Sequence, residues 1–452
     1  YKLGMLSSPI KKDIAFVLKG CVDKDSVAGH LTTGDFKLNF NSGEGLPLFL
    51  SRFDRFTNTL MHQLKVRALD HAALRRALPK VTLYCQTGIN NTFADYLALQ
   101  GIRFSNMTIG ISTSPLQGLD CHAKILGLKK DSTQIDTISL VAVQDTSHIE
   151  IHGRAINNKS NPMGAFRIAL NGEINSVDGN LLAEYFDKSN NTGLRLGVRF
   201  TPDEKKGGIL LNIIPEKPII AFRQFHFENN NNQISLLPNG GVLANVDLVD
   251  NENMSFRIHS VDNDSTSLQN LDVAISQLKL DELARLLPYS PPLSGTLSLD
   301  ANYVQTDEKK MSLSIEGNID KLCYDQKMIG NMTLGATWLP GEKGRQYVDA
   351  YISQDGKKVL LADGDLNPKG GGKDTLDVNA RFDHFPLKVA NVFVPNQMVS
   401  FEGDIDGNMH LEGSATKPVI NGSLKMDSVM LTYNQAGTHY RFDSRPLQIV
   451  NN

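Results

Sequence analysis

Hydrophobic and polar residues alternate with a period of two along most of the chain. In the longest example the apolar positions are Val399, Phe401, Ile405, Met409 and Leu411. The same alternation recurs in residues 149–155, 166–174, 194–200, 242–248, 293–303 and 311–319. A strand with one buried and one solvated face has this period, whereas strands of a parallel α/β sheet are apolar on both faces. The pattern therefore predicts an all-β protein built on an antiparallel sheet.

Helical spacing occurs only in short segments placed at regular intervals. We expect short helices at residues 69–78, 180–187, 280–287 and 387–394. All but the second are followed directly by a proline, which stops a helix because it lacks an N–H group. The helices end near positions 79, 187, 288 and 395, which are 108, 101 and 107 residues apart. This spacing predicts an internal repeat of about 105 residues.

The repeat predicts one elongated body divided into four segments. Residues 1–187 contain the first repeats and two of the short helices, and residues 188–288 and 289–395 are one repeat each, ending in a helix. Residues 396–452 begin a further repeat, which suggests that the sequence is a fragment of a longer chain. Neighbouring repeats bury their apolar faces together, so a continuous apolar surface follows. Separate β-sandwich domains with short helices spaced by chance are the alternative.

An apolar sheet face must close on itself, pack on a second layer or hold an apolar molecule. The expected helices are too short and too few to form a second layer. Glycines on the apolar side, including Gly317, Gly407 and Gly422, indicate bends in the strands. We therefore expect the sheet to curl into a taco-like groove whose apolar interior holds acyl chains. The candidate residues lining this groove are Leu297, Leu299, Ile315, Phe401, Ile405, Met409, Leu411, Leu424 and Met426.

Composition excludes several classes of partner. The chain has 46 Lys and Arg against 49 Asp and Glu, a net charge of -3, and neither sign forms a long run. A nucleic-acid partner would require a concentrated basic face, so none is expected. No apolar run reaches the ~18–20 residues of a transmembrane helix. Four scattered cysteines with no CxxC pair predict buried free thiols: Cys21, Cys85, Cys121 and Cys323.

Motifs of known enzymes are missing from the sequence. It contains no GxSxG elbow, HExxH zinc pair, GxxxxGK[ST] phosphate loop or GxGxxG after a strand. We therefore predict no catalytic activity, no cofactor and no metal site. His148 and His152 share one side of a strand and are interpreted as solvated or locally hydrogen-bonded. The acidic turn at residues 262–264 lacks the glycine and the distal glutamate of a calcium loop.

Two segments resemble the TamB proteins and the wider AsmA-like group. Residues 280–303 read LDELARLLPYSPPLSGTLSLDANY, a Leu-rich helix closed by proline, and residues 401–433 repeat G-x-hydrophobic strands. The second segment also contains a Thr-x-Pro-hydrophobic-x-Gly step at Thr416, Pro418, Ile420 and Gly422. The likeness covers residues 270–452 clearly and residues 60–270 mainly through their period. The resemblance implies a long sheet bent into a groove with an apolar lumen.

The resemblance also implies a location and partners. TamB-like proteins are periplasmic bridges of Gram-negative envelopes, anchored in the inner membrane by an N-terminal helix and meeting an outer-membrane barrel of the Omp85 class at their C-terminal domain. We expect that anchor to lie outside this sequence. The first functional hypothesis is transport of phospholipids between the two membranes. The second is a scaffold of the translocation and assembly module that lends edge strands to nascent barrels. An extracellular β-sandwich adhesion array is the third.

Overall fold

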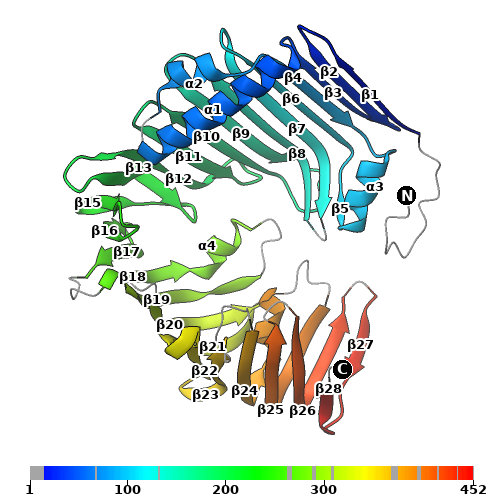
Figure 1. The fold of residues 1–452 in the computed structure, drawn as a ribbon. Coiled ribbons are helices and arrows are strands. Elements are labelled where there is room, and N and C mark those ends of the chain that lie inside the picture. Colours follow the sequence, from blue (N-terminus) through cyan, green and yellow to red (C-terminus); the bar gives the residue numbers. More distant parts are fainter. Residues whose placement is uncertain are drawn as a thin grey trace. The chain divides into compact units, whose positions relative to one another are not determined.

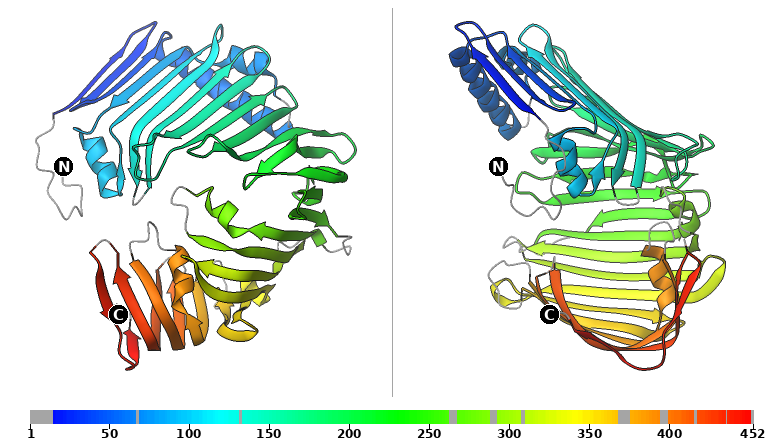
Figure 2. Two further views of the ribbon diagram at one scale, coloured as in Figure 1. Left: turned by 180° about the vertical axis from the view of Figure 1, so that it is seen from behind. Right: turned by 90° about the vertical axis from the view of Figure 1, so that its right-hand side faces the viewer.

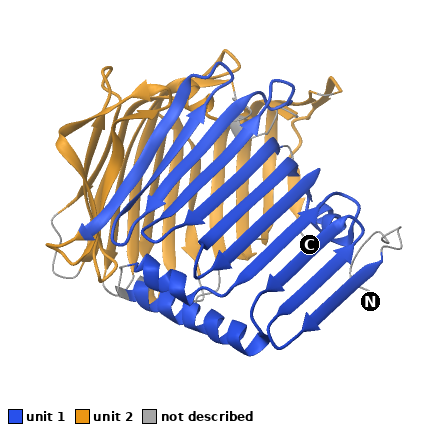
Figure 3. Cartoon of the chain, turned by 90° about the horizontal axis from the view of Figure 1, so that it is seen from above, with its two compact units in different colours: residues 1–202 blue, residues 203–452 orange. Residues whose placement is uncertain are grey.

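A computed structural model of the chain describes residues 15–66, 69–130, 133–261, 267–287, 292–306, 310–367, 375–393, 399–414, 417–434 and 436–450. In these residues, 28 strands belong to one antiparallel sheet that does not close into a barrel (Figure 1). The predicted all-β class, a repetitive antiparallel sheet with few short helices, is confirmed. The chain divides into two compact units, residues 1–202 and 203–452 (Figure 3).

Unit 1 is a meander in which strands that follow one another in sequence usually pair. Its strands are β1 (Phe16–Val22), β2 (Val27–Thr33), β3 (Phe36–Ser42), β4 (Val81–Thr87), β5 (Ile102–Arg103), β6 (Asn106–Ser114), β7 (Gly118–Lys130), β8 (Thr133–Gln144), β9 (Ile149–Asn157), β10 (Phe166–Ile174), β11 (Gly179–Phe186) and β12 (Thr192–Asp203). The short β5 pairs with β7, and β4 pairs directly with β6. Every ladder between these strands is antiparallel, so one hairpin leads into the next.

Unit 2 continues the same meander with longer strands. They are β13 (Gly208–Ile220), β14 (Arg223–Gln224), β15 (His226–Leu236), β16 (Val242–Val249), β17 (Ser255–Ser260), β18 (Ser267–Lys279), β19 (Leu293–Thr306), β20 (Met311–Tyr324), β21 (Lys327–Pro340), β22 (Gln346–Gln354), β23 (Lys357–Leu366), β24 (Thr375–Pro386), β25 (Val399–Ser414), β26 (Lys417–Tyr433), β27 (Thr438–Arg441) and β28 (Leu447–Val450). The sheet of this unit curves along its strand order (Figure 2).

Helices are few, and three of the four predicted ones are present. They are α2 (His71–Ala77), α4 (Leu280–Ala284) and the 3₁₀ helix η2 (Leu387–Phe393). The Asp70 carboxylate accepts a 2.8 Å hydrogen bond from the Ala73 amide and so caps α2. A second 3₁₀ turn, η1 (Glu342–Gly344), joins β21 and β22. Among the described helices none combines the length and apolar character needed to cross a bilayer.

The helix predicted at residues 180–187 is wrong, because this segment is strand β11. Its apolar residues Leu181, Ala183 and Tyr185 alternate, and each lies opposite an apolar residue or a glycine of β10 and β12. Pairing with two neighbours outweighs the weak helix propensity of so short a segment. The repeat of about 105 residues thereby loses one of its four markers and stays a prediction.

Two helices of unit 1 were not predicted from the sequence. They are α1 (Leu46–Val66) and α3 (Thr92–Leu99). Neither matches the short segment closed by proline that marked the predicted helices, since no proline directly follows Val66 or Leu99. Several predicted features lie outside the described residues: Pro288, Pro395, Thr416, the end of the fourth helix and the acidic turn at 262–264.

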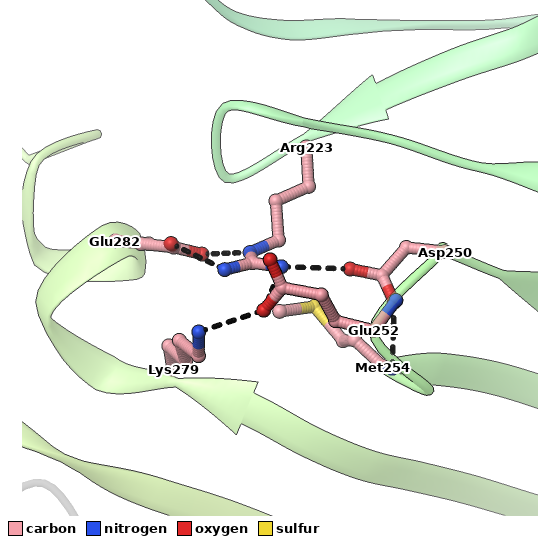
Figure 4. Close-up of polar contacts among 6 residues, drawn as sticks. All are labelled: Arg223, Asp250, Glu252, Met254, Lys279 and Glu282. Atoms are coloured by element: carbon pink, nitrogen blue, oxygen red, sulfur yellow. Dashed lines mark hydrogen bonds and ion pairs between the residues drawn. The ribbon is translucent and has the colours of Figure 1, made fainter.

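An ion-pair network fixes α4 to the turns beside β14 and β16 (Figure 4). The Nη1 atom of Arg223 lies 3.0 Å from Asp250 and 2.8 Å from Glu252. Its Nε and Nη2 atoms both bind the Glu282 carboxylate. Lys279 joins the network through Glu252 at 2.9 Å. The Arg223 side chain is only 15% exposed and that of Asp250 3%. Because these side chains are shielded from water, removing one charge would leave its partner buried and unpaired, which would destabilise the folded state.

The same network closes one end of a hydrophobic cluster. Asp250 accepts a 2.8 Å hydrogen bond from the amide of Met254, a residue that is 1% exposed. Met254 packs with Phe225, Val246, Leu248 and Leu278 in the core of β14–β18. The polar turn thus fixes the end of a core that is otherwise held by burial of apolar surface.

We expect Arg223→Gln to lower the free energy of unfolding by about 3 kcal/mol, because three carboxylates lose their shared cation. Chemical denaturation followed by circular dichroism measures this loss. Arg345→Gln is the matched control, since Arg345 is half exposed and pairs only with Asp365; its effect should stay below about 1 kcal/mol. Equal effects of the two substitutions would contradict the role given to the network.

Candidate functional site: an apolar sheet face

Strand register in unit 2 aligns apolar residues into rows that run across nine strands, from β18 to β26. Residues opposite one another in a ladder point to the same face of the sheet. The first row contains Ile275, Leu299, Gly317, Leu334, Ile352, Leu360, Phe382, Gly407 and Leu424. The next row, here called the alanine row, contains Val273, Ala301, Ile315, Ala336, Ala350, Ala362, Ala380, Met409 and Gly422.

A third row follows on the other side of the alanine row. It contains Leu271, Tyr303, Leu313, Trp338, Val348, Gly364, Val378, Leu411 and Ile420. We call the three rows together the apolar face. None of its residues carries a charge. Over β21–β24 the central row consists of four alanines, so small side chains lie there between two rows that contain mostly large ones.

The opposite face of the same strands is polar. One of its rows contains Asp272, Asn302, Ser314, Thr337, Asp349, Asp363, Asn379, His410 and Asn421. Neighbours in this row bond to each other: Asn302 donates to Asp272 at 2.6 Å. A hollow of about 580 Å³ near β24–β28 is lined mainly by such polar side chains, among them Arg381 and Gln448. This face suits water, so the two faces of the sheet differ in chemistry.

Besides the core of β14–β18, two buried clusters in unit 2 include residues of the short helices. One cluster joins Leu280 of α4 to Leu322, Tyr324 and Met332, and another joins Ile405, Leu424 and Val429 with Leu387 of η2 packed against them. The alanine row and the third row, in contrast, contain half-buried residues and no fully buried one. Within the described residues, burial is complete beneath the helices and partial along the centre of the apolar face.

The nine predicted lining residues fall into two groups on this face. Leu297, Leu299 and Ile315 lie on β19 and β20, and the rest lie on β25 and β26. Ile405 and Leu424 are only 5% and 7% exposed and belong to the core under η2. Leu299, Ile315, Met409, Leu411 and Leu424 lie on the three rows, whereas Leu297, Phe401 and Met426 lie nearer the helices or beyond a bulge.

Sequence reasoning missed the alanines at the centre of the face. Ala336, Ala350, Ala362 and Ala380 are opposite one another in successive strands. Alanine contributes little to a hydrophobic pattern, so alternation alone did not mark these positions. Their common row emerges only when the register of four strands is known.

Two glycines of the apolar side, Gly295 and Gly403, mark irregular strands, whereas Gly317, Gly407 and Gly422 pair in regular register. Gly295 has φ 138° and Gly403 has φ 92°, values that a side chain would disfavour. Each lies at a register shift, between Ser294 and Thr296 in β19 and between Glu402 and Asp404 in β25. Bulges of this kind bend a strand and increase its twist.

Polar side chains gather at one bulge between β24 and β25. Asp383, His384 and Asp406 present side-chain ligand atoms within 4.8 Å of one another. The hydrogen bond with Asp383, at 3.0 Å, and the charge of Asp406 raise the pKa of His384 above its ordinary value. Burial and the nearby Asp427 raise the pKa of Asp404. The site is exposed at the surface and lies away from the alanine row.

Other predicted polar sites are local. His148 bonds to Glu150 at 3.1 Å and His152 bonds to Asn171 at 3.0 Å, so the interpretation of both as locally hydrogen-bonded is confirmed. The four cysteines are free, as predicted. The expectation that all are buried is confirmed only for Cys85: Cys121 and Cys323 are half-buried, and Cys21 is exposed on β1, where its thiol donates to Asp23 at 3.2 Å. Strand β1 leaves all of its residues exposed.

Comparison with known proteins adds no relative. No protein-family model, curated protein or solved structure matches this chain. The resemblance to TamB proteins is therefore carried by the sequence segments alone, and a function must be inferred from the geometry of the sheet.

We expect the ring of His384 to titrate above an ordinary histidine. Because the folded state raises this pKa, its stabilising effect is present below the ordinary histidine pKa and is lost as pH rises through the folded value. A pH titration by NMR measures it directly. Asp383→Asn and Asp406→Asn should each lower the pKa of His384, whereas Asp349→Asn, on a distant strand, should leave it unchanged.

Proposed function

We propose that this chain binds phospholipid acyl chains along the apolar face and carries them between the inner and outer membranes of a Gram-negative envelope. The observation that carries the proposal is the uninterrupted apolar face of β18–β26, whose central alanine row is half-buried and uncharged. The periplasmic location, the inner-membrane anchor and an Omp85-class barrel partner belong to the proposal through the resemblance to TamB proteins.

The length of the apolar face suits an acyl chain. Neighbouring strands are about 4.8 Å apart, so nine strands span about 38 Å measured along the sheet. One leaflet of a bilayer core is about 15 Å thick, half of the ~30 Å of the whole core. The face is thus longer than one extended acyl chain, and a lipid can advance along it without leaving apolar contact.

The energetics favour tails over headgroups. Each buried methylene contributes about 0.8 kcal/mol, and the rows offer no charge to pair with a phosphate. The indole nitrogen of Trp338, on the third row, is buried and has no hydrogen-bond partner among the described residues. The Trp338 ring therefore offers apolar surface to a bound tail. A lipid tail therefore fits the chemistry of the face, and its headgroup would remain outside.

Trp338 is the single tryptophan of the chain, and it reports on this face. We expect phospholipids with brominated acyl chains to quench its fluorescence. Ala350→Phe should raise the lipid concentration that gives half-maximal quenching about tenfold, because a phenyl ring would occupy the space above the alanine row. Asp349→Phe, at the adjacent position on the polar face, is the matched control. Quenching that is absent, or equal in both variants, would refute the proposal.

Strand addition at a sheet edge is the second candidate function. It is favoured by β1, which pairs with β2 and exposes Phe16, Leu18 and Val22 by 62–72%. An exposed apolar strand of this kind can pair with a strand of another chain, such as a nascent outer-membrane barrel. This activity would use backbone groups of the edge and not the alanine row.

Proline substitutions at Val17 and Leu18 each remove one N–H group of β1. Because N–H groups of successive residues point in opposite directions, one substitution removes an N–H that faces β2 and the other removes an N–H that faces away from the sheet. We expect only the variant that removes an outward N–H to reduce stimulation of barrel folding in a refolding assay. The other variant, which weakens the β1–β2 ladder, serves as the control. If both variants stimulate folding like the unchanged chain, edge pairing is not a function of β1.

A further inference from the structure

Helix α1 in unit 1 is apolar on two sides. One side is docked: the Phe49 ring lies 5.6 Å from that of Phe40 on β3, and Gln63 is buried, accepting a 2.9 Å hydrogen bond from the Asp70 amide. A second side faces away from the protein. Its residues Leu46, Leu50, Phe53 and Met61 are 37%, 54%, 55% and 62% exposed. The helix therefore buries only part of its apolar surface.

These four exposed residues lie on one stripe. Their spacing of four, three and eight residues places them on the same side of an α-helix. Thr57 occupies the position between Phe53 and Met61 and bonds back to the Phe53 carbonyl at 2.9 Å. An exposed Leu, Phe and Met stripe of this length is more than the scattered apolar residues of an ordinary surface.

The same region carries an excess of positive charge. Residues 44–80 contain seven Lys and Arg against three Asp and Glu, a net charge of +4 in a chain whose total is -3. Arg52 is paired with Glu44 at 3.1 Å. Arg55, Lys65, Arg76 and Lys80 are exposed, and in the described part of the chain none of the four makes an ion pair. The charge therefore faces solvent without compensation.

Two turns of the sheet adjoin the helices and extend this surface. Arg75 donates to the Pro115 carbonyl at 3.2 Å, and the Leu69 amide donates to the Ser176 carbonyl at 2.6 Å. The turns display Leu116 and Val177, which are 85% and 50% exposed. Figure 3 shows α1 and α2 along the strand ends of unit 1. We call α1, α2 and the turns at residues 115–117 and 175–178 the helical edge; Asp178 lowers its net charge by one.

A hollow of about 700 Å³ opens within this edge. It is lined by Lys80, by the Arg52–Glu44 pair and by hydroxyl and amide side chains that include Ser112, Ser114 and Asn41. Leu116 lies at its rim. Hydrogen-bond donors and a free ammonium beside exposed apolar residues match the phosphate and first methylenes of a lipid.

We propose that the helical edge docks on the surface of an anionic phospholipid bilayer. The apolar stripe enters the boundary between headgroups and tails, and the unpaired cations meet lipid phosphates. Unpaired cations favour this occupant over a second copy of the chain, because a copy would bring like charges together. The inference does not depend on acyl-chain binding by unit 2, since different residues and a different unit are involved.

Vesicle co-sedimentation of the full chain tests the proposal. We expect binding to vesicles of equal parts phosphatidylglycerol and phosphatidylcholine, and weak binding to phosphatidylcholine alone. Removal of Lys65 and Arg76 as Lys65→Gln/Arg76→Gln should weaken binding about fivefold for each cation. Phe53→Ser/Met61→Ser should weaken it at least tenfold. The matched control is Met328→Ser/Tyr440→Ser, whose residues are 65% and 57% exposed in unit 2.

Each outcome decides the question. Binding that requires phosphatidylglycerol, falls with added salt and is lost in the helical-edge variants but not in the control supports docking. The proposal is overturned if Phe53→Ser/Met61→Ser and Met328→Ser/Tyr440→Ser bind anionic vesicles equally well, or if the unchanged chain does not bind them. A dimer in light scattering that Phe53→Ser/Met61→Ser dissociates, without vesicle binding, would identify a second copy as the occupant. Trp338 quenching by brominated lipid is measured separately, so failure of one proposal is distinguishable from failure of the other.

Discussion

The register of the antiparallel ladder is the constraint on which the rest of this structure depends. A shift of one residue in any strand of β18–β26 would move its apolar side chains to the polar face. Leu299, Gly317 and Leu334 lie opposite one another only in the observed register. Irregularities are confined to strand ends, where Gly295 and Gly403 adopt backbone angles that keep the rows beyond them aligned. Continuity of the apolar face is thus a property of the pairings and not of any one strand.

The sizes of the side chains along the rows then determine the shape of the apolar face. In the first row Gly317 leaves space that Leu334 fills, since a Cβ on the glycine would lie 3.3 Å from the leucine Cγ. In the alanine row four consecutive strands supply alanine, so no large neighbour fills the space. The same backbone pattern therefore places large side chains in one row and small ones in the next, which is the basis for proposing a bound acyl chain.

Charge has opposite uses in the two units. In unit 2 Arg223 is surrounded by three carboxylates, and its pKa is raised first by the hydrogen bond with Glu282, so this cation is committed to the fold. In unit 1, Arg55, Lys65 and Arg76 of the helical edge make no ion pair among the described residues, and their charge is available to a ligand. Both arrangements use the same residue types, so pairing, and not composition, distinguishes a structural cation from a binding one.

Alternation of apolar and polar residues by itself determined the all-β class, the antiparallel sheet and which side of each strand is apolar, because a period of two is a local property. Helical spacing and the prolines that follow likewise indicated α2 and α4 from local rules. Only the tertiary structure decided that residues 180–187 form a strand, since their partners lie on β10 and β12. It also decided that α1 leaves a stripe exposed and that Ala336, Ala350, Ala362 and Ala380 form one row. These features depend on contacts between residues distant in sequence, which no local pattern records.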